Sequence, residues 1–229
     1  MKNILVVVTN VSKYPNQERA TGLWFGEAVH FVDKMEKEGY KIDYVSPKGG
    51  YTPIDPHSLQ PDQMTTLDWQ YYLNHDFLNK LSATLSADDI NPKDYDAIYY
   101  TGGHGVMWDF PDNEKLQNIA GEIYKNGGIV SAVCHGSVGL LNIKNAAGGN
   151  LIADKKVTGF ANTEEIAVGL EKSVPFLTED ELINKGADYV KGADWAEFAV
   201  ADERIVSGQN PSSGGAVAKE VIKLLKAAQ

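Results

Sequence analysis

Short apolar runs alternate with longer amphipathic segments along this chain. Four runs are rich in β-branched and aromatic residues and end at turn residues, a pattern typical of buried strands in a parallel sheet. We expect these strands at residues 4–9, 41–46, 96–103 and 128–134.

Two segments between these runs repeat their apolar residues with helical spacing, and a glycine lies at or just past each end. They predict helices at 22–39 and 113–128. Strands that alternate with helices of this length form βαβ units. The pattern therefore predicts an α/β fold with a mainly parallel sheet covered by helices on both faces.

Residues 48–92 interrupt this rhythm, because they are rich in Pro, Tyr, Asp and Asn and contain one helical piece around 76–85. We expect this inserted segment to lie over the edge of the sheet or above the strand ends, where ligands bind in such folds.

The second half of the chain predicts further elements of the same domain. We expect a strand at 155–160, two strands within 196–211 joined near Ala201–Glu203, and a closing amphipathic helix at 212–229. There is no internal repeat or linker-like stretch, so we expect one domain over residues 1–229.

Composition and charge narrow the class of protein. With 43% hydrophobic and 10% aromatic residues, the chain is ordinary for a globular protein, which excludes disordered and fibrous classes. The net charge of −10 and the presence of only two arginines argue against nucleic acid or an anionic membrane as the main partner. A single cysteine excludes an intramolecular disulfide. The first apolar run is too short for a signal peptide or a membrane span, so we expect a cytoplasmic protein.

That single cysteine lies where a predicted strand ends, in "AVCHG" (132–136). The small-x-Cys-x-small pattern resembles the G-x-S-x-G turn of serine hydrolases, in which a strained backbone lifts the nucleophile into a cleft. The pattern predicts that Cys134 is a nucleophile. The alternative is a cysteine that only packs in the core.

A nucleophilic cysteine needs help to ionise. Free cysteine has a pKa of about 8.5, and lowering it by about three units takes roughly 4 kcal/mol. A helix that begins at Cys134 would supply only about 0.3–1 kcal/mol. We therefore expect a further hydrogen-bond donor at the sulfur.

The glycine-rich stretch "YYTGGHG" (99–105) ends the preceding strand, on the same edge of the sheet as Cys134. We predict that the backbone N–H groups of Gly103 and His135 form an oxyanion hole. The alternative is a tight loop in which Gly102 and Gly103 are glycines only because the backbone adopts a positive φ.

All five histidines lie within the first 135 residues. This excludes the arrangement of glutamine amidotransferases of the same general fold, whose catalytic histidine lies well downstream of the cysteine. The base that works with Cys134 is therefore His135 or an upstream histidine, and the adjacent one is the simplest choice.

Five motifs in this order resemble the ThiJ/PfpI superfamily: "TGGHG", "GGIVSAVCHG", "VTGFANTEE", "PFLTEDELINKGADYV" and "VSGQNP". Within it, they are similar to the branch of glutathione-independent glyoxalases (glyoxalase III), which are also described as stress chaperones and protein deglycases. The likeness covers nearly the whole chain. One departure is Ser137, where many relatives carry proline.

The resemblance implies a flavodoxin-like three-layer α/β sandwich, as in class I glutamine amidotransferases, and a homodimer. It also implies conversion of methylglyoxal or a similar 2-oxoaldehyde to a 2-hydroxy acid (D-lactate) with no cofactor. Three other functions stay open from the residues themselves: a Cys–His hydrolase (amidase, peptidase or deglycase), a holding chaperone and a thiol redox sensor. We expect no metal site, since no group of potential ligands has metal-binding spacing.

The resemblance also implies two acidic site residues. The acid that completes the Cys–His pair falls on Glu165, with Glu164 as the fallback, whereas the residues alone fit a solvated helix start capped by Asn162 equally well. Relatives place a glutamate of the first helix beside the sulfur, which falls on Glu27, although helical spacing alone fits a solvated side chain equally well. If Glu27 faces Cys134, we expect its carboxyl to be neutral and to donate the missing hydrogen bond.

Overall fold

A computed structural model describes residues 2–228, and its centre is one seven-stranded sheet in the order β3-β2-β1-β4-β5-β9-β8. All neighbouring strands in it are parallel except β8 and β9, which form an antiparallel pair. Its strands are β1 (Asn3–Val7), β2 (Lys41–Ser46), β3 (Leu85–Ser86), β4 (Ala97–Tyr100), β5 (Ile129–Val133), β8 (Ala199–Asp202) and β9 (Ile205–Gly208).

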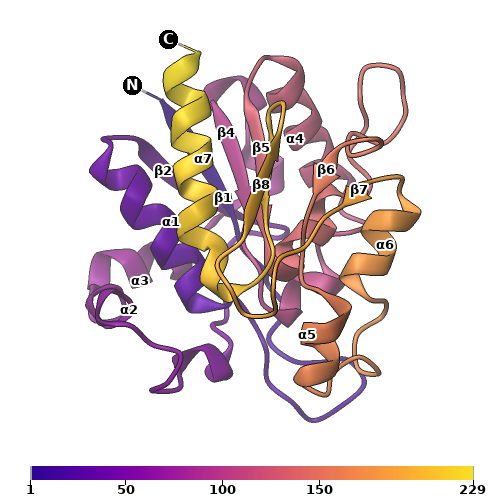
Figure 1. The fold of residues 1–229 in the computed structure, drawn as a ribbon. Helices are drawn as coiled ribbons and strands as arrows, with labels where there is room; N and C mark the ends of the chain where they lie inside the picture. The colour runs from indigo at the N-terminus through magenta and orange to yellow at the C-terminus, as the bar shows by residue number, and fades with distance from the viewer. Residues whose placement is uncertain (1, 229) are drawn as a thin grey trace.

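Helices cover both faces of this sheet (Figure 1). The α-helices are α1 (Phe25–Lys37), α2 (Thr66–Tyr72), α3 (His75–Ser82), α4 (Glu114–Lys125), α5 (Asn162–Ala167), α6 (Thr178–Asn184) and α7 (Gly214–Ala227). Short 3₁₀ helices are η1 (Pro56–Leu59), η2 (Ala87–Asp89), η3 (Pro92–Asp94), η4 (His104–Trp108), η5 (Cys134–Leu140) and η6 (Pro211–Ser213).

Strand β1 shows why two layers of helices form. Its side chains alternate, so that Ile4 and Val6 belong to the apolar core under α1 and α7, while Leu5 and Val7 belong to the core under α4. All four side chains are fully buried, and both faces of the strand therefore need a cover. The α/β sandwich expected from the sequence is confirmed.

The inserted segment also lies where we expected it, at the edge of the sheet, since β3 pairs with β2 as the outermost strand. It contains two α-helices, α2 and α3, where the sequence predicted one. The predicted strand at 155–160 is also wrong in extent. Only β6 (Lys156–Val157) is extended, and it pairs with β7 (Asp188–Tyr189) in a separate two-stranded sheet.

The remaining predicted strands and helices form within a few residues of their expected bounds. The closing helix α7 ends at Ala227, and its predicted last residue, Gln229, lies outside the described residues. Across residues 2–228, no helix combines the length and apolar character that crossing a membrane requires.

The order of the strands predicts where a ligand crevice lies, at the carboxyl ends of the strands beside β1. Strand β1 lies between β2 and β4, so the chain turns to opposite sides of β1 at this point, and the carboxyl ends of the parallel strands open there. The residues after β4 and β5, Thr101–Gly103 and Cys134, follow strands that end at this edge.

Candidate active site

The turn after β5 has the strained backbone that the sequence pattern predicts. Cys134 has a φ of +55°, an uncommon conformation for a residue other than glycine. Gly136 must be small, because a Cβ there would lie 2.4 Å from the carbonyl oxygen of Tyr100 and 2.5 Å from that of Thr101. A side chain at position 136 would therefore clash with the end of β4.

The chain beyond this turn continues as the 3₁₀ helix η5 and not as the α-helix we expected. The backbone N–H of His135 donates to the Cys134 sulfur and favours the thiolate. Burial has the larger effect and, together with the nearby Glu27 carboxyl, raises the pKa of the Cys134 thiol. The expectation of a thiolate in the resting protein is therefore wrong: the proton must leave when the reaction begins.

His135 is placed to take that proton. Its Nδ1 lies 3.4 Å from the Cys134 sulfur, and its Nε2–H donates to Glu165 Oε2 over 2.6 Å. The ring is held between His104 and Phe160, whose ring centroids lie 4.0 and 4.3 Å away. With its proton on Nε2, the imidazole presents the Nδ1 lone pair to the thiol.

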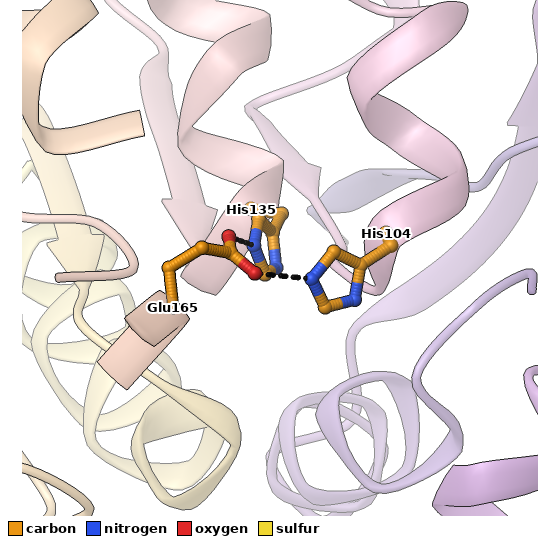
Figure 2. Close-up of side chains that lie close together, drawn as sticks. All are labelled: His104, His135 and Glu165. Carbon is orange, nitrogen blue, oxygen red and sulfur yellow. Dashed lines mark hydrogen bonds and ion pairs between the residues drawn. The ribbon is translucent and has the colours of Figure 1, made fainter. Parts of the chain in front are cut away.

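Glu165, on α5, is the carboxylate of this site (Figure 2). It is buried and accepts a second hydrogen bond, from His104 Nε2–H over 2.7 Å. Burial by itself would raise its pKa. The charge of His135 and the hydrogen bonds from both histidines outweigh burial and hold the pKa of Glu165 well below its usual range.

The fallback acid, Glu164, has a different task. Its carboxylate accepts hydrogen bonds from the backbone N–H groups of Ala161 and Trp195, at 3.0 and 2.8 Å, and from Asn210 Nδ2 at 2.9 Å. These bonds cap the start of α5 and tie it to two loops. The helix begins at Asn162 with Ala161 as its cap residue, so Asn162 is not the cap that we considered.

His104 is a site residue that the sequence analysis missed. It is the first residue of η4, and Figure 2 shows its ring pointing at the same carboxylate as His135. Burial and the neighbouring His135 lower its pKa, so it is a neutral donor. The signal was present, because His104 lies inside the "TGGHG" motif, whose glycines alone had drawn a functional interpretation.

Glu27, on α1, lies against the cysteine, as the resemblance implied. It is fully buried, its Oε2 accepts from the Gly102 N–H over 2.7 Å, and its carboxyl lies beside the Cys134 thiol. Burial raises the pKa of Glu27 to about 8. The carboxyl is therefore mostly protonated at neutral pH, which agrees with our expectation.

The two glycines of the turn after β4 both permit close approach. A Cβ on Gly102 would lie 2.5 Å from Glu27 Oε2 and 3.0 Å from the Cys134 Cβ. Gly103 has a φ of +96°, and a Cβ on it would lie 2.2 Å from the Gly22 carbonyl oxygen. The positive φ and the lack of space for a side chain are enough to explain the glycine at position 103. The oxyanion hole therefore stays a prediction.

A cavity of about 520 Å³ lies over this group. It is lined by Trp24, His57, Gln60, Asp62, Gln63, His104, Cys134, His135, Phe160, Val168, Trp195, Pro211 and Ser212. Cys134 is 2% exposed and lines this cavity, so it is not enclosed by aliphatic side chains alone. This volume has ample room for a small organic substrate.

The same group contains potential metal ligands, although no spacing in the sequence suggested them. One ligand atom each of His104, His135 and Glu165 lies within 4.8 Å of the others. Both Nε2–H groups point at the carboxylate, so a metal ion would have to replace these two hydrogen bonds. The arrangement fits proton transfer better than metal binding.

Comparisons with known proteins identify the family and support the fold. The model of the DJ-1/PfpI family matches residues 25–224. The "Glutathione-independent glyoxalase HSP31" of Saccharomyces cerevisiae is 34% identical over 98% of both chains. The crystal structure of glyoxalase III from Candida albicans superposes with a TM-score of 0.90 at 34% identity over 97% of both chains. The structure of Rapid Encystment Protein 24 KDa from Francisella tularensis has a TM-score of 0.94 at 39% identity, over 98% of this chain and 99% of its own.

Proposed function

The chain belongs to the DJ-1/PfpI family, and we propose that it is a glutathione-independent glyoxalase that converts methylglyoxal or a similar 2-oxoaldehyde to the 2-hydroxy acid. The observation that carries this proposal is the position of Cys134. Its thiol contacts a neutral carboxyl, Glu27, and a histidine–carboxylate pair, His135–Glu165, beside an open cavity.

The reaction begins with formation of a covalent bond. His135 Nδ1 removes the Cys134 proton as the sulfur attacks the aldehyde carbon, and Glu165 stabilises the imidazolium that forms. We propose that the protonated Glu27, which lies beside the thiol, donates to the sulfur as its negative charge develops. The N–H groups of Gly103 and His135 are the proposed donors to the aldehyde oxygen of the resulting hemithioacetal.

The proton then moves between the two substrate carbons. The imidazolium first gives the thiol's proton to the hemithioacetal oxyanion, so that His135 is neutral again. His135 then removes the hydrogen from the former aldehyde carbon, which gives an enediolate. The hydroxyl proton passes to the neighbouring oxygen, and His135 returns the carbon-bound proton at the neighbouring carbon. The product is a 2-hydroxyacyl thioester on Cys134. Water cleaves it to the 2-hydroxy acid, D-lactate for methylglyoxal, and the thiol is restored.

This reaction needs no external oxidant, reductant or second thiol, and its substrate is a small molecule. A redox sensor fits less well, because rapid oxidation requires an exposed thiol of low pKa, and here the thiol is buried and its pKa is raised. We further propose that the protein acts as a homodimer in the cytoplasm.

The direct test is to incubate the purified protein with methylglyoxal, with no glutathione present, and to measure both enantiomers of lactate. We expect D-lactate from the wild type and none above background from Cys134→Ala. The absence of lactate with the wild type would overturn the proposal. Hydrolysis of amide or glycated substrates by the same protein would then favour the hydrolase.

A further inference from the structure

A second histidine–carboxylate pair lies in the wall of the same cavity. His57 Nδ1–H donates to Asp55 Oδ1 over 2.9 Å, and His57 lines the cavity together with Cys134 and His135. Asp55 is 2% exposed and also accepts from Thr21 Oγ1 over 3.0 Å. The mechanism above does not use this pair.

The backbone holds this pair in a fixed place relative to the cysteine. Asp55 N–H donates to the Leu23 carbonyl over 2.9 Å, and Leu23 N–H donates to Pro53 over 2.8 Å. The next residue, Trp24, donates its N–H to the Gly102 carbonyl over 3.1 Å. These bonds tie the segment before His57 to the glycine turn that contacts Glu27 and Cys134.

A purely structural role explains only part of this arrangement. Asp55 caps η1 by accepting from the His57 N–H over 2.8 Å, and this cap needs nothing from the imidazole. The further bond to Nδ1 fixes the tautomer of the ring and leaves the Nε2 lone pair free to accept a proton. Among residues 2–228, nothing bonds to His57 Nε2, and the side chain is 46% exposed, so water can reach that nitrogen.

The reaction still requires a base in its last stage. His135 is aimed at the sulfur and held on both sides by His104 and Phe160, so its Nδ1 serves the thiol and the carbon-bound proton. The water that cleaves the thioester enters through the cavity, whose wall includes His57. An imidazole whose Nε2 has no bonding partner among the described residues is suited to removing a proton from that water.

We propose that His57, oriented by Asp55, is the base that activates water for hydrolysis of the acyl-enzyme, an inference that rests on the proposed glyoxalase function. The water oxygen bonds to the thioester carbon as Nε2 takes one water proton. The carbon–sulfur bond then breaks, and the sulfur leaves as thiolate. The proton on His57 returns through water to Cys134, which releases the 2-hydroxy acid and restores the resting enzyme.

The test separates the two halves of the reaction. In rapid-quench experiments with methylglyoxal, we expect His57→Ala to form the acyl-enzyme at the wild-type rate but to turn over about 10²-fold more slowly. The thioester should accumulate, and hydroxylamine, which cleaves thioesters without a base, should restore turnover and yield the hydroxamate of lactate. Asp55→Asn should act in the same direction with a smaller effect.

The matched control is His75→Ala, which removes an exposed histidine at the start of α3, outside the cavity lining, and should behave as wild type. Equal slowing of acyl-enzyme formation and turnover in His57→Ala, or no change relative to His75→Ala, would overturn the role of His57. Both results presuppose lactate production by the wild type. Its absence would instead defeat the proposed function.

Discussion

Two buried glutamates flank the Cys134–His135 pair, and their carboxyl groups differ in charge. Glu27 accepts one backbone N–H and touches the thiol, and burial raises its pKa to about 8. Glu165 is almost equally buried, but it accepts from two histidines, which hold its pKa well below the usual range. Burial therefore does not decide the charge of a carboxyl group by itself: the number and charge of its donors do.

The difference assigns the two roles. A neutral carboxyl can donate a hydrogen bond to sulfur as it becomes negative, and an ionised one can hold an imidazole and stabilise its positive charge. Interchanging the two environments would place a carboxylate beside the thiolate and leave the histidine without a counter-ion. Substitutions that change one of the two carboxyl groups, or one of its hydrogen-bond donors, test this difference between Glu27 and Glu165.

We expect the largest loss of activity when the ionised carboxylate, Glu165, is replaced. Glu165→Gln keeps the shape of the side chain but removes the charge that supports the imidazolium, so kcat should fall about 10³-fold. Steady-state kinetics with methylglyoxal measure it. Glu164→Gln is the matched control, because this neighbour bonds only to Ala161, Trp195 and Asn210, and its loss should cost stability of about 1–3 kcal/mol while kcat changes little. A similar loss of kcat in both variants would contradict the assignment.

The neutral carboxyl of Glu27 should influence how kcat/KM depends on pH. In the wild type, kcat/KM should fall as pH rises through about 8, because Glu27 then ionises and opposes the thiolate. Glu27→Gln keeps a donor that cannot ionise, so this decline should disappear. Glu27→Ala has no donor, and its kcat/KM should lie about 10–100-fold below that of Glu27→Gln at every pH, the value of one hydrogen bond to a charged group.

The pH dependence of the free energy of unfolding gives an independent measure of the pKa of Glu27. The pKa of Glu27 rises from 4.5 to about 8 on folding, so between these values the folded protein binds more protons than the unfolded chain. Stability contributed by the protonated group is therefore lost as pH rises through this window. Urea unfolding should show wild type weakening relative to Glu27→Gln from pH 5 to pH 8, and a constant difference would show that Glu27 is charged throughout.

Local patterns in the sequence were sufficient to predict the sheet and the turn at Cys134. The strained turn at Cys134 follows from small residues on both sides of it, and β1, β2, β4 and β5 follow from short apolar runs. The placement of Glu165 came from the resemblance, since its own neighbourhood fits a capped helix equally well. The protonation state of Cys134 was missed because it depends on burial under α1, which no local pattern encodes.

Other failures have the same origin in distant contacts. The predicted strand at 155–160 stops at Val157 because the next backbone N–H, that of Thr158, donates to the side-chain hydroxyl of Ser207 in β9 and not to a backbone carbonyl. Helix α2 was missed because it is short and depends on a capping box between Thr65 and Asp68. That box is visible in the sequence and could have been recognised.

The smallest effect is expected at His104, which is the second hydrogen-bond donor to Glu165. His104→Phe removes one of the two donors that keep this carboxylate ionised, so the pKa of Glu165 should rise and kcat should fall by about tenfold, mostly at acidic pH. His104→Gln still offers an N–H at the end of its side chain and should recover most of the loss. A role limited to filling space beside Tyr14 and His135 would reverse this order, because the larger phenylalanine packs better than glutamine there. The acidic limb of the pH profile, measured for both variants, therefore distinguishes a donor to Glu165 from a packing residue.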